Sequence, residues 1–241
     1  SSTTTWTQQG ADIDGEAAYD VGGWSVSLSS DGTTVAIGAY NNDDNGSNSG
    51  HVRIYSWDSS TTTWTQQGAD IDGEAAGDVS GYSVSLSSDG TTVAIGAPFN
   101  SDNGYDSGHV RIYSWDSATA TWTQQGADID GEAAGDQSGY SVSLSSDGTT
   151  VAIGAYRNDA NGSSSGHVRI YSWDSATWDQ QGPDINGAAA NDYSGSSVSL
   201  SSDGTTVAIG APFNDANGSN SGHVRIYAWN SATWVQQGDD I

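Results

Sequence analysis

The stretch Gly81-Tyr-Ser-Val-Ser-Leu-Ser-Ser-Asp-Gly-Thr-Thr-Val-Ala-Ile-Gly-Ala97 decides the fold, because near-copies of it stand at residues 23–39, 139–155 and 195–211. Each copy is followed by a polar loop, by the segment Gly-His-Val-Arg-Ile-Tyr-Ser/Ala-Trp and then by Trp-X-Gln-Gln-Gly-X-Asp-Ile. The copies begin 58 residues apart, and the last interval is 56. A fixed period of this size is typical of solenoids, propellers and arrays, so the fold is built from four equivalent units.

The quoted stretch predicts two strands joined by a hairpin. Val84 and Leu86 alternate with serines, and Val93 and Ile95 alternate with small residues, as expected for strands. Asp-Gly between two such segments predicts a two-residue hairpin turn. The four turns are expected at Asp31-Gly32, Asp89-Gly90, Asp147-Gly148 and Asp203-Gly204.

Two further strands complete each unit. Residues 109–115 alternate in the same way, and the Trp-X-Gln-Gln-Gly segment follows after a turn, whereas no segment has the 3.6-residue period of a helix. Four antiparallel strands per repeat predict an all-β fold of β-propeller-type blades. A lone sheet so rich in Ser and Gly buries too little apolar area to offset its ordering entropy, so neighbouring blades must supply its second face. We expect one repetitive domain over residues 1–241, with blades at about 22–71, 80–129, 138–185 and 194–241. A β-solenoid and an open array of β-units are the alternatives.

The count of strands is uneven. The first three strand types occur four times, but Trp-X-Gln-Gln-Gly-X-Asp-Ile occurs five times, at 6–13, 64–71, 122–129, 178–185 and 234–241. If the C-terminal copy completes the last blade, residues 6–13 are a surplus fourth strand without a blade of its own. An unpaired strand edge is a template for another chain, and head-to-tail contacts of this kind give rings or fibres. We therefore expect self-association, as a homo-oligomer or filament, or continuation of a longer array.

Composition narrows the class of protein. The chain has 5 Lys+Arg against 30 Asp+Glu, a formal net charge of −25, and neither Cys nor Met. Such a surface repels nucleic acid and anionic lipid, and the absence of Cys excludes disulfides and thiolate sites. No apolar run reaches the length of a membrane span, so we expect no membrane insertion. High acidity with abundant Ser, Thr, Asn and Gly favours an extracellular or cell-surface location, and the start at Ser1 fits a processed precursor or an excised window.

The repeat resembles the FG-GAP repeat of integrin α-subunit propellers and of many surface proteins of bacteria and algae. Gly-Tyr-Ser-Val-Ser-Leu, Val-Ala-Ile-Gly-Ala-Pro and Gly-His-Val-Arg-Ile-Tyr carry the resemblance, with Gly-Ala-Pro at 96–98 and 210–212 and Gly-Ala-Tyr at 38–40 and 154–156. The resemblance covers essentially the whole chain. It implies propeller blades and an extracellular adhesive or scaffolding role, without a particular ligand. The family's calcium loop between the first two strands has no counterpart in the short 88–91 connection.

Acidic residues gather after each fourth strand, around a glycine. Closely spaced carboxylates at a turn suit Ca²⁺, which takes six to eight oxygen ligands, and solvated turn-capping acids are the alternative. The candidate calcium ligands are Asp12, Asp14, Glu16, Asp20, Asp70, Asp72, Glu74, Asp78, Asp128, Asp130, Glu132 and Asp136, and the last copy weakens to Asp184, Asn186, Ala188 and Asp192. The loops between the second and third strands carry Asn-Gly-Ser sequons, so Asn45, Asn161 and Asn217 are candidate glycosylation sites.

The histidines, arginines and tryptophans that recur at equivalent positions of the repeats are expected to be structural. His51, His109, His167 and His223 each begin a third strand on a different blade, which favours a histidine bonded locally within its blade. The four arginines of the third strands are expected to pair with surplus carboxylates, and nine of the ten tryptophans recur in register, as for packing between blades.

No residue set suggests catalysis. Trp24, Tyr105, Arg157 and Tyr193 break the symmetry of the repeats but form no acid/base or nucleophile set, so we expect no enzyme. The sequence favours a non-enzymatic extracellular structural or adhesive repeat protein that self-assembles through its terminal strand. The alternative is a multivalent carbohydrate-binding, lectin-like propeller, and a surface-protein ligand also stays open.

Overall fold

The computed structural model describes residues 5–241, which form β-strands, turns and loops without any helix. In this range no helix is long and apolar enough to cross a membrane. The strands form four antiparallel sheets, one for each repeat, which we call blades 1 to 4 from the N-terminus. The predicted all-β architecture of four blades is confirmed.

The blades share one strand order. Blade 1 holds β1 (Ser25–Leu28), β2 (Thr34–Ala39), β3 (His51–Asp58), β4 (Thr63–Gln66) and β5 (Ile71–Asp72). Blade 2 holds β6 (Ser83–Leu86), β7 (Thr92–Ala97), β8 (His109–Asp116), β9 (Thr121–Gln124) and β10 (Ile129–Asp130). Blade 3 holds β11 (Ser141–Leu144), β12 (Thr150–Ala155), β13 (His167–Trp173), β14 (Trp178–Gln180) and β15 (Ile185–Asn186), and blade 4 holds β16 (Ser197–Leu200), β17 (Thr206–Ala211), β18 (His223–Trp229) and β19 (Trp234–Gln236).

The predicted fourth strand is interrupted in the structure. Both β4 and β5 pair with β3, and the same holds for β9 and β10 with β8 and for β14 and β15 with β13. In blade 4 the end of the chain occupies the position that β5 has in blade 1. Val224 and Ile241 exchange two backbone hydrogen bonds of 3.0 Å there. The C-terminal copy therefore completes blade 4.

The Asp-Gly turns lie where the sequence predicts them, but the predicted two-residue length is wrong. Ser29 N donates to Thr34 O at 2.8 Å, which closes a loop of four residues, 30–33. The Asp31 carboxylate accepts hydrogen bonds from Ser29 Oγ at 2.8 Å and Thr33 N at 2.9 Å. Gly32 has a positive φ of 72°, whereas a two-residue type I′ turn needs positive φ at both central residues. Asp31 instead binds its own loop and holds the wider turn.

These turn carboxylates predict a component of acid unfolding. At Asp203 the hydrogen bonds from the Ser201 side chain and from Thr205 lower the carboxyl pKa from 3.8 to about 2. Between these values the folded state keeps the charge that the unfolded chain neutralises, so this stabilisation is present above pH 3.8 and disappears as the pH falls toward 2. We expect the melting-temperature difference between the chain and its Asp203→Asn variant to shrink over this range, as measured by circular dichroism. Parallel curves would contradict the assignment.

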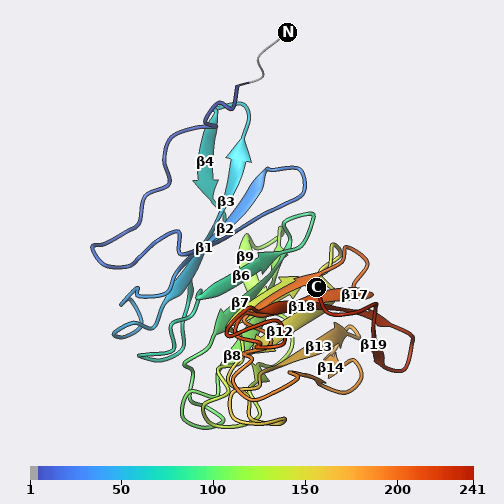
Figure 1. Cartoon of the computed structure of the whole chain (residues 1–241). Helices are drawn as coiled ribbons and strands as arrows, with labels where there is room; N and C mark the ends of the chain where they lie inside the picture. Colours follow the sequence, from blue (N-terminus) through green and yellow to red (C-terminus); the bar gives the residue numbers. More distant parts are fainter. Residues whose placement is uncertain (1–4) are drawn as a thin grey trace.

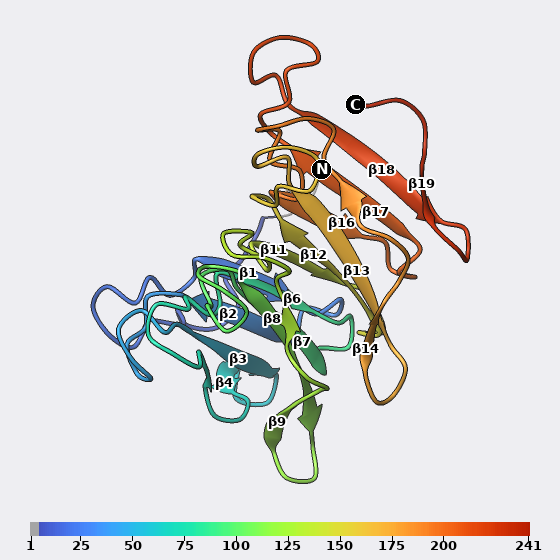
Figure 2. The same ribbon diagram turned by 90° about the horizontal axis from the view of Figure 1, so that it is seen from below.

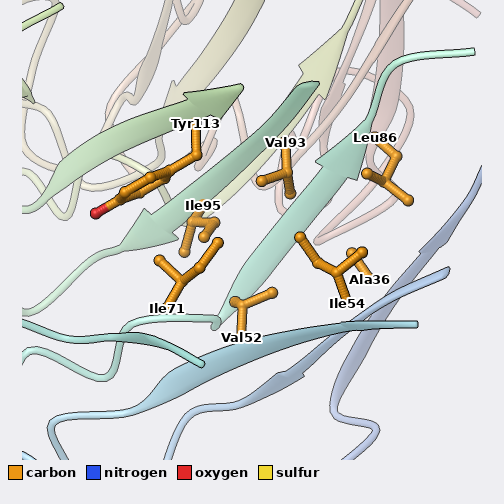
Figure 3. Packing of buried hydrophobic residues seen from close by; sticks show 8 residues of the cluster. All are labelled: Ala36, Val52, Ile54, Ile71, Leu86, Val93, Ile95 and Tyr113. Atoms are coloured by element: carbon orange, nitrogen blue, oxygen red, sulfur yellow. The ribbon is translucent and has the colours of Figure 1, made fainter. Parts of the chain in front are cut away.

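The hydrophobic core lies between blades. Ala36, Val52, Ile54 and Ile71 of blade 1 face Leu86, Val93, Ile95 and Tyr113 of blade 2 (Figure 3). Equivalent clusters join blades 2 and 3, and blades 3 and 4. Each blade thus has a first face, which packs on the preceding blade, and a second face, which packs on the following one. The expectation that neighbours supply the second face is confirmed.

The first strands of the blades lie side by side at the inner edge of the array. Ser30 N donates to Ser88 O at 2.9 Å, Ser88 N to Ser146 O at 2.8 Å and Ser146 N to Ser202 O at 2.9 Å. Serine side chains of the first strands also bind the neighbouring blade, since Leu86 N donates to Ser27 Oγ at 2.9 Å. The blades follow one another in chain order, with blade 1 and blade 4 at opposite ends of an arc (Figures 1 and 2).

Residues 6–13 form no strand ladder, although the sequence predicts a surplus strand there. The reason is that no third strand precedes them among the described residues. The segment nevertheless lies on blade 1 as its counterpart lies on blade 2. Trp64 Nε1 donates to Gln9 O at 2.9 Å, just as Trp122 Nε1 donates to Gln67 O at 2.8 Å. Trp6, whose own neighbours would belong to a preceding blade, is fully exposed.

Candidate metal centre

The acidic loops that the sequence singled out divide into three structural roles. The last acid of each loop, Asp20, Asp78, Asp136 or Asp192, is buried. Asp78 Oδ2 accepts hydrogen bonds from Ala75 N at 3.0 Å and from Asn100 Nδ2 at 3.1 Å. This acid therefore closes its own turn and ties it to the loop of the next blade, which is the turn-capping alternative.

The first two acids of each loop point to different places. Asp70 Oδ1 accepts a hydrogen bond from Gln66 Nε2, while Oδ2 faces His51. Asp72 contributes its backbone, because its carbonyl oxygen accepts a 2.6 Å hydrogen bond from Arg111 Nη2. Burial raises the pKa of the Asp72 carboxyl, and the nearby Asp70 charge raises it further. Asp12 and Asp14 behave alike: Asp12 accepts from Gln8 Nε2 at 2.7 Å, and the Asp14 carbonyl accepts from Arg53 Nη2 at 2.8 Å.

The glutamate of each loop reaches the following blade. Glu74 Oε1 lies 3.6 Å from Arg111 Nη1, and Glu74 Oε2 lies 3.8 Å from His109 Nδ1. Burial raises the pKa of Glu74, and the charge of Arg111 opposes that shift. Glu16 and Glu132 make the same contacts to blades 1 and 3. The expected pairing of the third-strand arginines with surplus carboxylates is confirmed.

Around His51 and His109 the structure gathers acids from different loops, and the glutamate is the one acid of the preceding predicted loop that joins each cluster. Around His167, two acids of one predicted loop, Glu132 and Asp136, come together. The potential ligand atoms within 4.8 Å of one another belong to Glu16, Asp44, His51 and Asp70, to Glu74, Asp102, His109 and Asp128, and to Glu132, Asp136 and His167. Sequence reasoning missed Asp44, Asp102 and the histidines. The signal was present, since every third-strand histidine with such a cluster has a glutamate 35 residues before it.

The expectation of locally bonded histidines is wrong for Nδ1. The side chains of His51, His109 and His167 are 1% exposed, and within residues 5–241 none of these Nδ1 atoms has a hydrogen-bond partner, nor has Nε2 of His109 or His167. Burial, aided by the charge of the neighbouring arginine, lowers the pKa of His109, and it lowers the pKa of His167 to about 4. The lowered pKa values favour the neutral form of His109 and His167 at pH 7, in which their contacts with carboxylates are not ion pairs.

The candidate glycosylation sites carry structural hydrogen bonds. Asn45 Nδ2 donates to Gly73 O at 2.7 Å, and Asn161 Nδ2 donates to Gly187 O at 2.7 Å. Asn103, which has no sequon, makes the same bond to Gly131 O. The asparagine thus recurs for a structural reason, and glycosylation at the sequons, including the exposed Asn217, stays a prediction.

The tryptophans pack between blades as predicted. Each fourth-strand tryptophan of blades 1 to 4 donates its indole N–H to a glutamine carbonyl of the preceding fourth-strand segment, at 2.8–2.9 Å. Each also lies beside the last tryptophan of its third strand, with ring centroids 5.3–5.5 Å apart.

Two of the residues that break the repeat symmetry join a band of aromatic rings along the blades. Trp24 lies 4.9 Å from Tyr40, and Tyr193 lies 5.5 Å from Tyr156, between ring centroids. Arg157 lies over the Tyr156 ring at 5.4 Å. These contacts account for the residues by packing, and the absence of catalysis stays a prediction.

Three equivalent cavities open beside the fourth-strand segments. Their volumes are about 290, 260 and 300 Å³. The second is lined by Asp70, Asp72, Tyr113 and Trp122, among others. Each cavity offers two carboxylates and two aromatic side chains.

Comparison with known structures supports the propeller architecture. The chain is similar to a 6-phosphogluconolactonase candidate from Bacteroides uniformis, with 11% identity, a TM-score of 0.59 and coverage of 90% of this chain and 56% of that one. It is similar to the periplasmic gluconolactonase PpgL of Pseudomonas aeruginosa, with 13% identity, a TM-score of 0.59 and coverage of 89% and 56%. It is also similar to hydrazine synthase of Kuenenia stuttgartiensis, with 14% identity, a TM-score of 0.55 and coverage of 98% and 53%. The chain thus spans about half the length of these structures, and at these identities the likeness shows the fold alone.

No curated protein matches the chain. The family model of the FG-GAP repeat, in contrast, matches residues 6–55, 64–113, 122–171 and 186–227. These matches cover most of the sequence and include the third-strand histidines of all four blades. The chain belongs to the FG-GAP repeat family.

Proposed function

We propose that this chain is a non-enzymatic structural or adhesive repeat module that acts outside the cell and associates with further copies of itself. One observation carries the proposal. The two open faces at the ends of the arc are the two halves of the interface that the chain already uses three times internally.

The open first face belongs to blade 1. Leu28 is 58% exposed, whereas its equivalent Leu86 is 7% exposed against blade 1. Val26 on the same strand is also exposed. Burying a leucine or valine side chain contributes about 1.5–3 kcal/mol. This face therefore gains substantially when a preceding blade covers it.

The open second face belongs to blade 4. Ile241 is 76% exposed, whereas its equivalent Ile71 is 6% exposed beneath blade 2. A hollow of about 620 Å³ lies here, and Gly210, Gly222, Val224 and Ile241 are among its lining residues. In blade 1 the equivalent place is filled by the following blade, since Gly50 pairs with Ser80 in an isolated bridge. The hollow on blade 4 therefore lies at the place that the following blade covers in blade 1.

A second copy would bring residues 22–23 to this hollow, because they precede β1 as residues 80–81 precede β6. Two segments could then occupy the position of the fourth strand in blade 4. Residues 234–241 of the first copy hold it, and residues 6–13 of the second copy carry nearly the same sequence. The contact is head-to-tail and closes into a ring or continues as a fibre according to the rotation per step.

The location and the adhesive role are supported by composition and by family. A net charge of −25 with only five basic residues, all arginine, and no cysteine suits a highly solvated surface outside the cell. The FG-GAP repeat built into the whole chain supports a scaffold that presents loops, and the symmetry of the blades supports a role without catalysis.

The test changes the exposed end faces. We expect the 241-residue chain to show concentration-dependent association in sedimentation velocity, and Leu28→Asp to abolish it, because a carboxylate on the first face cannot be buried without a partner. Tyr105→Asp, at an exposed loop residue away from the end faces, is the matched control and should associate normally. A chain that stays monomeric at all concentrations, or equal behaviour of the two variants, would overturn the proposal.

Deleting residues 1–15 separates two routes of association. If residues 6–13 supply the fourth strand of the neighbouring copy, the deletion weakens association. Alternatively, residues 6–13 cover the surface of blade 1 on which residues 234–241 of a neighbouring copy would pack. In that case the deletion frees this surface and strengthens association. The same sedimentation experiment measures both.

A second function, multivalent binding of carbohydrate, is favoured by the three equivalent cavities. Aromatic faces and paired carboxylates are side chains that hold sugars by stacking and hydrogen bonds, and Trp122, Asp70 and Asp72 line one cavity together. A glycan array would first identify sugars that bind the chain. Calorimetry with these sugars would then show about three equivalent sites for each chain. Array binding that Leu28→Asp leaves intact would favour this function over self-association.

A further inference from the structure

The buried histidine nitrogens need an explanation that protein contacts do not give. His51 and His109 are almost wholly buried, and their Nδ1 atoms have no hydrogen-bond partner. A buried polar group without a hydrogen-bond partner destabilises the folded state. Among residues 5–241, Nδ1 of His167 and of His223 also lacks a partner, as does Nε2 of His109 and His167, so unpartnered histidine nitrogens are a repeated feature of the fold.

Each orphan nitrogen faces carboxylates from separate segments. His51 Nδ1 lies 3.7 Å from Asp70 Oδ2, 3.8 Å from Glu16 Oε2 and 4.0 Å from Asp44 Oδ2. Glu16 comes from the segment before blade 1, Asp44 from the loop between β2 and β3, and Asp70 from the loop between β4 and β5. In blade 2, His109 Nδ1 lies 3.7 Å from Asp128 and 3.8 Å from Glu74, and Asp102 completes the group.

These separations are too long for hydrogen bonds, which lie between about 2.7 and 3.2 Å. They are close to the spacing of ligands around a small ion. Tetrahedral ligands about 2.0–2.2 Å from a zinc ion are roughly 3.3–3.6 Å apart. The three distances from His51 Nδ1 exceed this spacing by a few tenths of an ångström, and the four ligand atoms all lie within 4.8 Å of one another. Within residues 5–241, Arg53 is the one arginine that pairs with any of the three converging acids, with Nη1 3.5 Å from Glu16 Oε1.

We propose that blades 1 and 2 each hold a zinc-class divalent cation, bound by one histidine Nδ1 and three carboxylates. The ligands are Glu16, Asp44, His51 and Asp70 in one site, and Glu74, Asp102, His109 and Asp128 in the other. Imidazole suits zinc and its first-row neighbours, whereas calcium takes six to eight oxygen ligands. The ion ties the connection before a blade to the third and fourth strands of that blade.

The four blades differ in how many of the proposed ligands they keep, so they can be compared within one chain. In blade 3, Ala160 stands where blades 1 and 2 have Asp44 and Asp102, so the set around His167 lacks one carboxylate. In blade 4 both acids are missing, since Ala216 and Ala188 stand in their places. There Asp240 bonds Arg225 Nε at 3.0 Å and lies 3.2 Å from His223 Nδ1. The proposal thus assigns two complete sites, one incomplete site and one blade without a site.

The experiment titrates Zn²⁺ into the untagged chain after chelation, with calorimetry and elemental analysis as readouts. We expect two tightly bound zinc ions for each chain, with a third only at higher concentration. Glu74→Gln should reduce the tight count from two to one, and Ala160→Asp should raise it to three. Asp239→Ala, an exposed acid beside blade 4, is the control and should leave two.

The outcomes separate the alternatives. Cobalt(II) in place of zinc should give visible absorption of tetrahedral intensity that scales with the same counts. A stoichiometry that neither Glu74→Gln nor Ala160→Asp changes would overturn the proposal. Calcium that binds as tightly as zinc at the same two sites would overturn the zinc assignment. Folding of each variant is checked by circular dichroism, and Glu74 and Ala160 lie on loops outside the strands, so their substitution spares the core.

Discussion

Gly96→Ala lowers the thermal stability of the whole array, and we expect this to be one of the largest effects of a single methyl group in the chain. A Cβ at Gly96 would overlap the carbonyl oxygen of Gly139 in the next blade and the hydroxyl of Ser83. The carbonyl belongs to backbone that packs on His109 O and Val110, so it cannot move away alone. Overpacking of this kind costs about 1–3 kcal/mol, and we expect the upper end.

The matched control is Gly210→Ala. Gly210 occupies the same place in blade 4, but no following blade covers it, and an added Cβ would meet only the Ser197 side chain at close range. For a domain of this size each kcal/mol shifts the melting temperature by about 2–4 °C. We therefore expect a fall of about 6–12 °C for Gly96→Ala and a much smaller one for Gly210→Ala in scanning calorimetry. Equal shifts would mean that blade–blade contact does not set the need for glycine.

Gly210→Ala also connects stability with association. If a second copy places its residues 22–23 in the hollow of blade 4, the added methyl group would block that contact while sparing the monomer. The glycine of the Val-Ala-Ile-Gly-Ala segment is thus explained by the next blade, inside the chain or outside it.

The sequence predicted the fold well because the deciding information is local. The alternation around Val84 and Val93 depends on neighbours in the chain and predicts strands directly. The length of the Asp-Gly loop escaped prediction, because Asp31 uses its side chain to bind Thr33 instead of allowing the two-residue turn that its dipeptide favours. The turn propensity of Asp-Gly predicts which residues form the turn. It does not predict which hydrogen bonds the Asp31 carboxylate accepts, and these set the length of the loop.

The candidate site was predicted only in part, because its residues meet through packing. Glu16 and Asp70 were identified as acids with possible cation affinity, but each was assigned to the acids next to it in sequence. They come together because the connection before a blade crosses the start of β3, where His51 is buried. Four equivalent positions suggested a purely structural role for the histidine, and the sequence alone does not show that its Nδ1 lacks a hydrogen-bond partner. The parallel loss of Glu and Asp in the last repeat, at Ala188 and Ala216, was a second signal in the sequence, beside the 35-residue spacing of glutamate and histidine.

Arg111→Met is the second substitution with a large expected effect. The Arg111 side chain is 7% exposed, donates to Asp72 O at 2.6 Å and lies 3.6 Å from Glu74. Asp72 ends β5 of blade 1, and Glu74 lies in the connection that enters blade 2. A hydrogen bond to a charged group contributes about 1.5–3 kcal/mol, and the substitution removes this donor from the part-buried contact with the Asp72 carbonyl. We expect a loss of about 2–3 kcal/mol in the free energy of unfolding, measured with urea in the presence of a chelator, so that any bound cation does not contribute.

Arg225→Met provides the comparison, because Arg225 is the same third-strand residue in blade 4. Its side chain is 20% exposed and pairs with Asp240, whose side chain is 35% exposed, instead of with a connection to another blade. Exposed ion pairs contribute about 0–1 kcal/mol, so the methionine variant should lose less than half as much stability as Arg111→Met. Similar losses for the two variants would show that the arginine stabilises its own blade. A large loss confined to Arg111 would show that it holds two blades together, which is the role that its contacts with Asp72 and Glu74 assign to it.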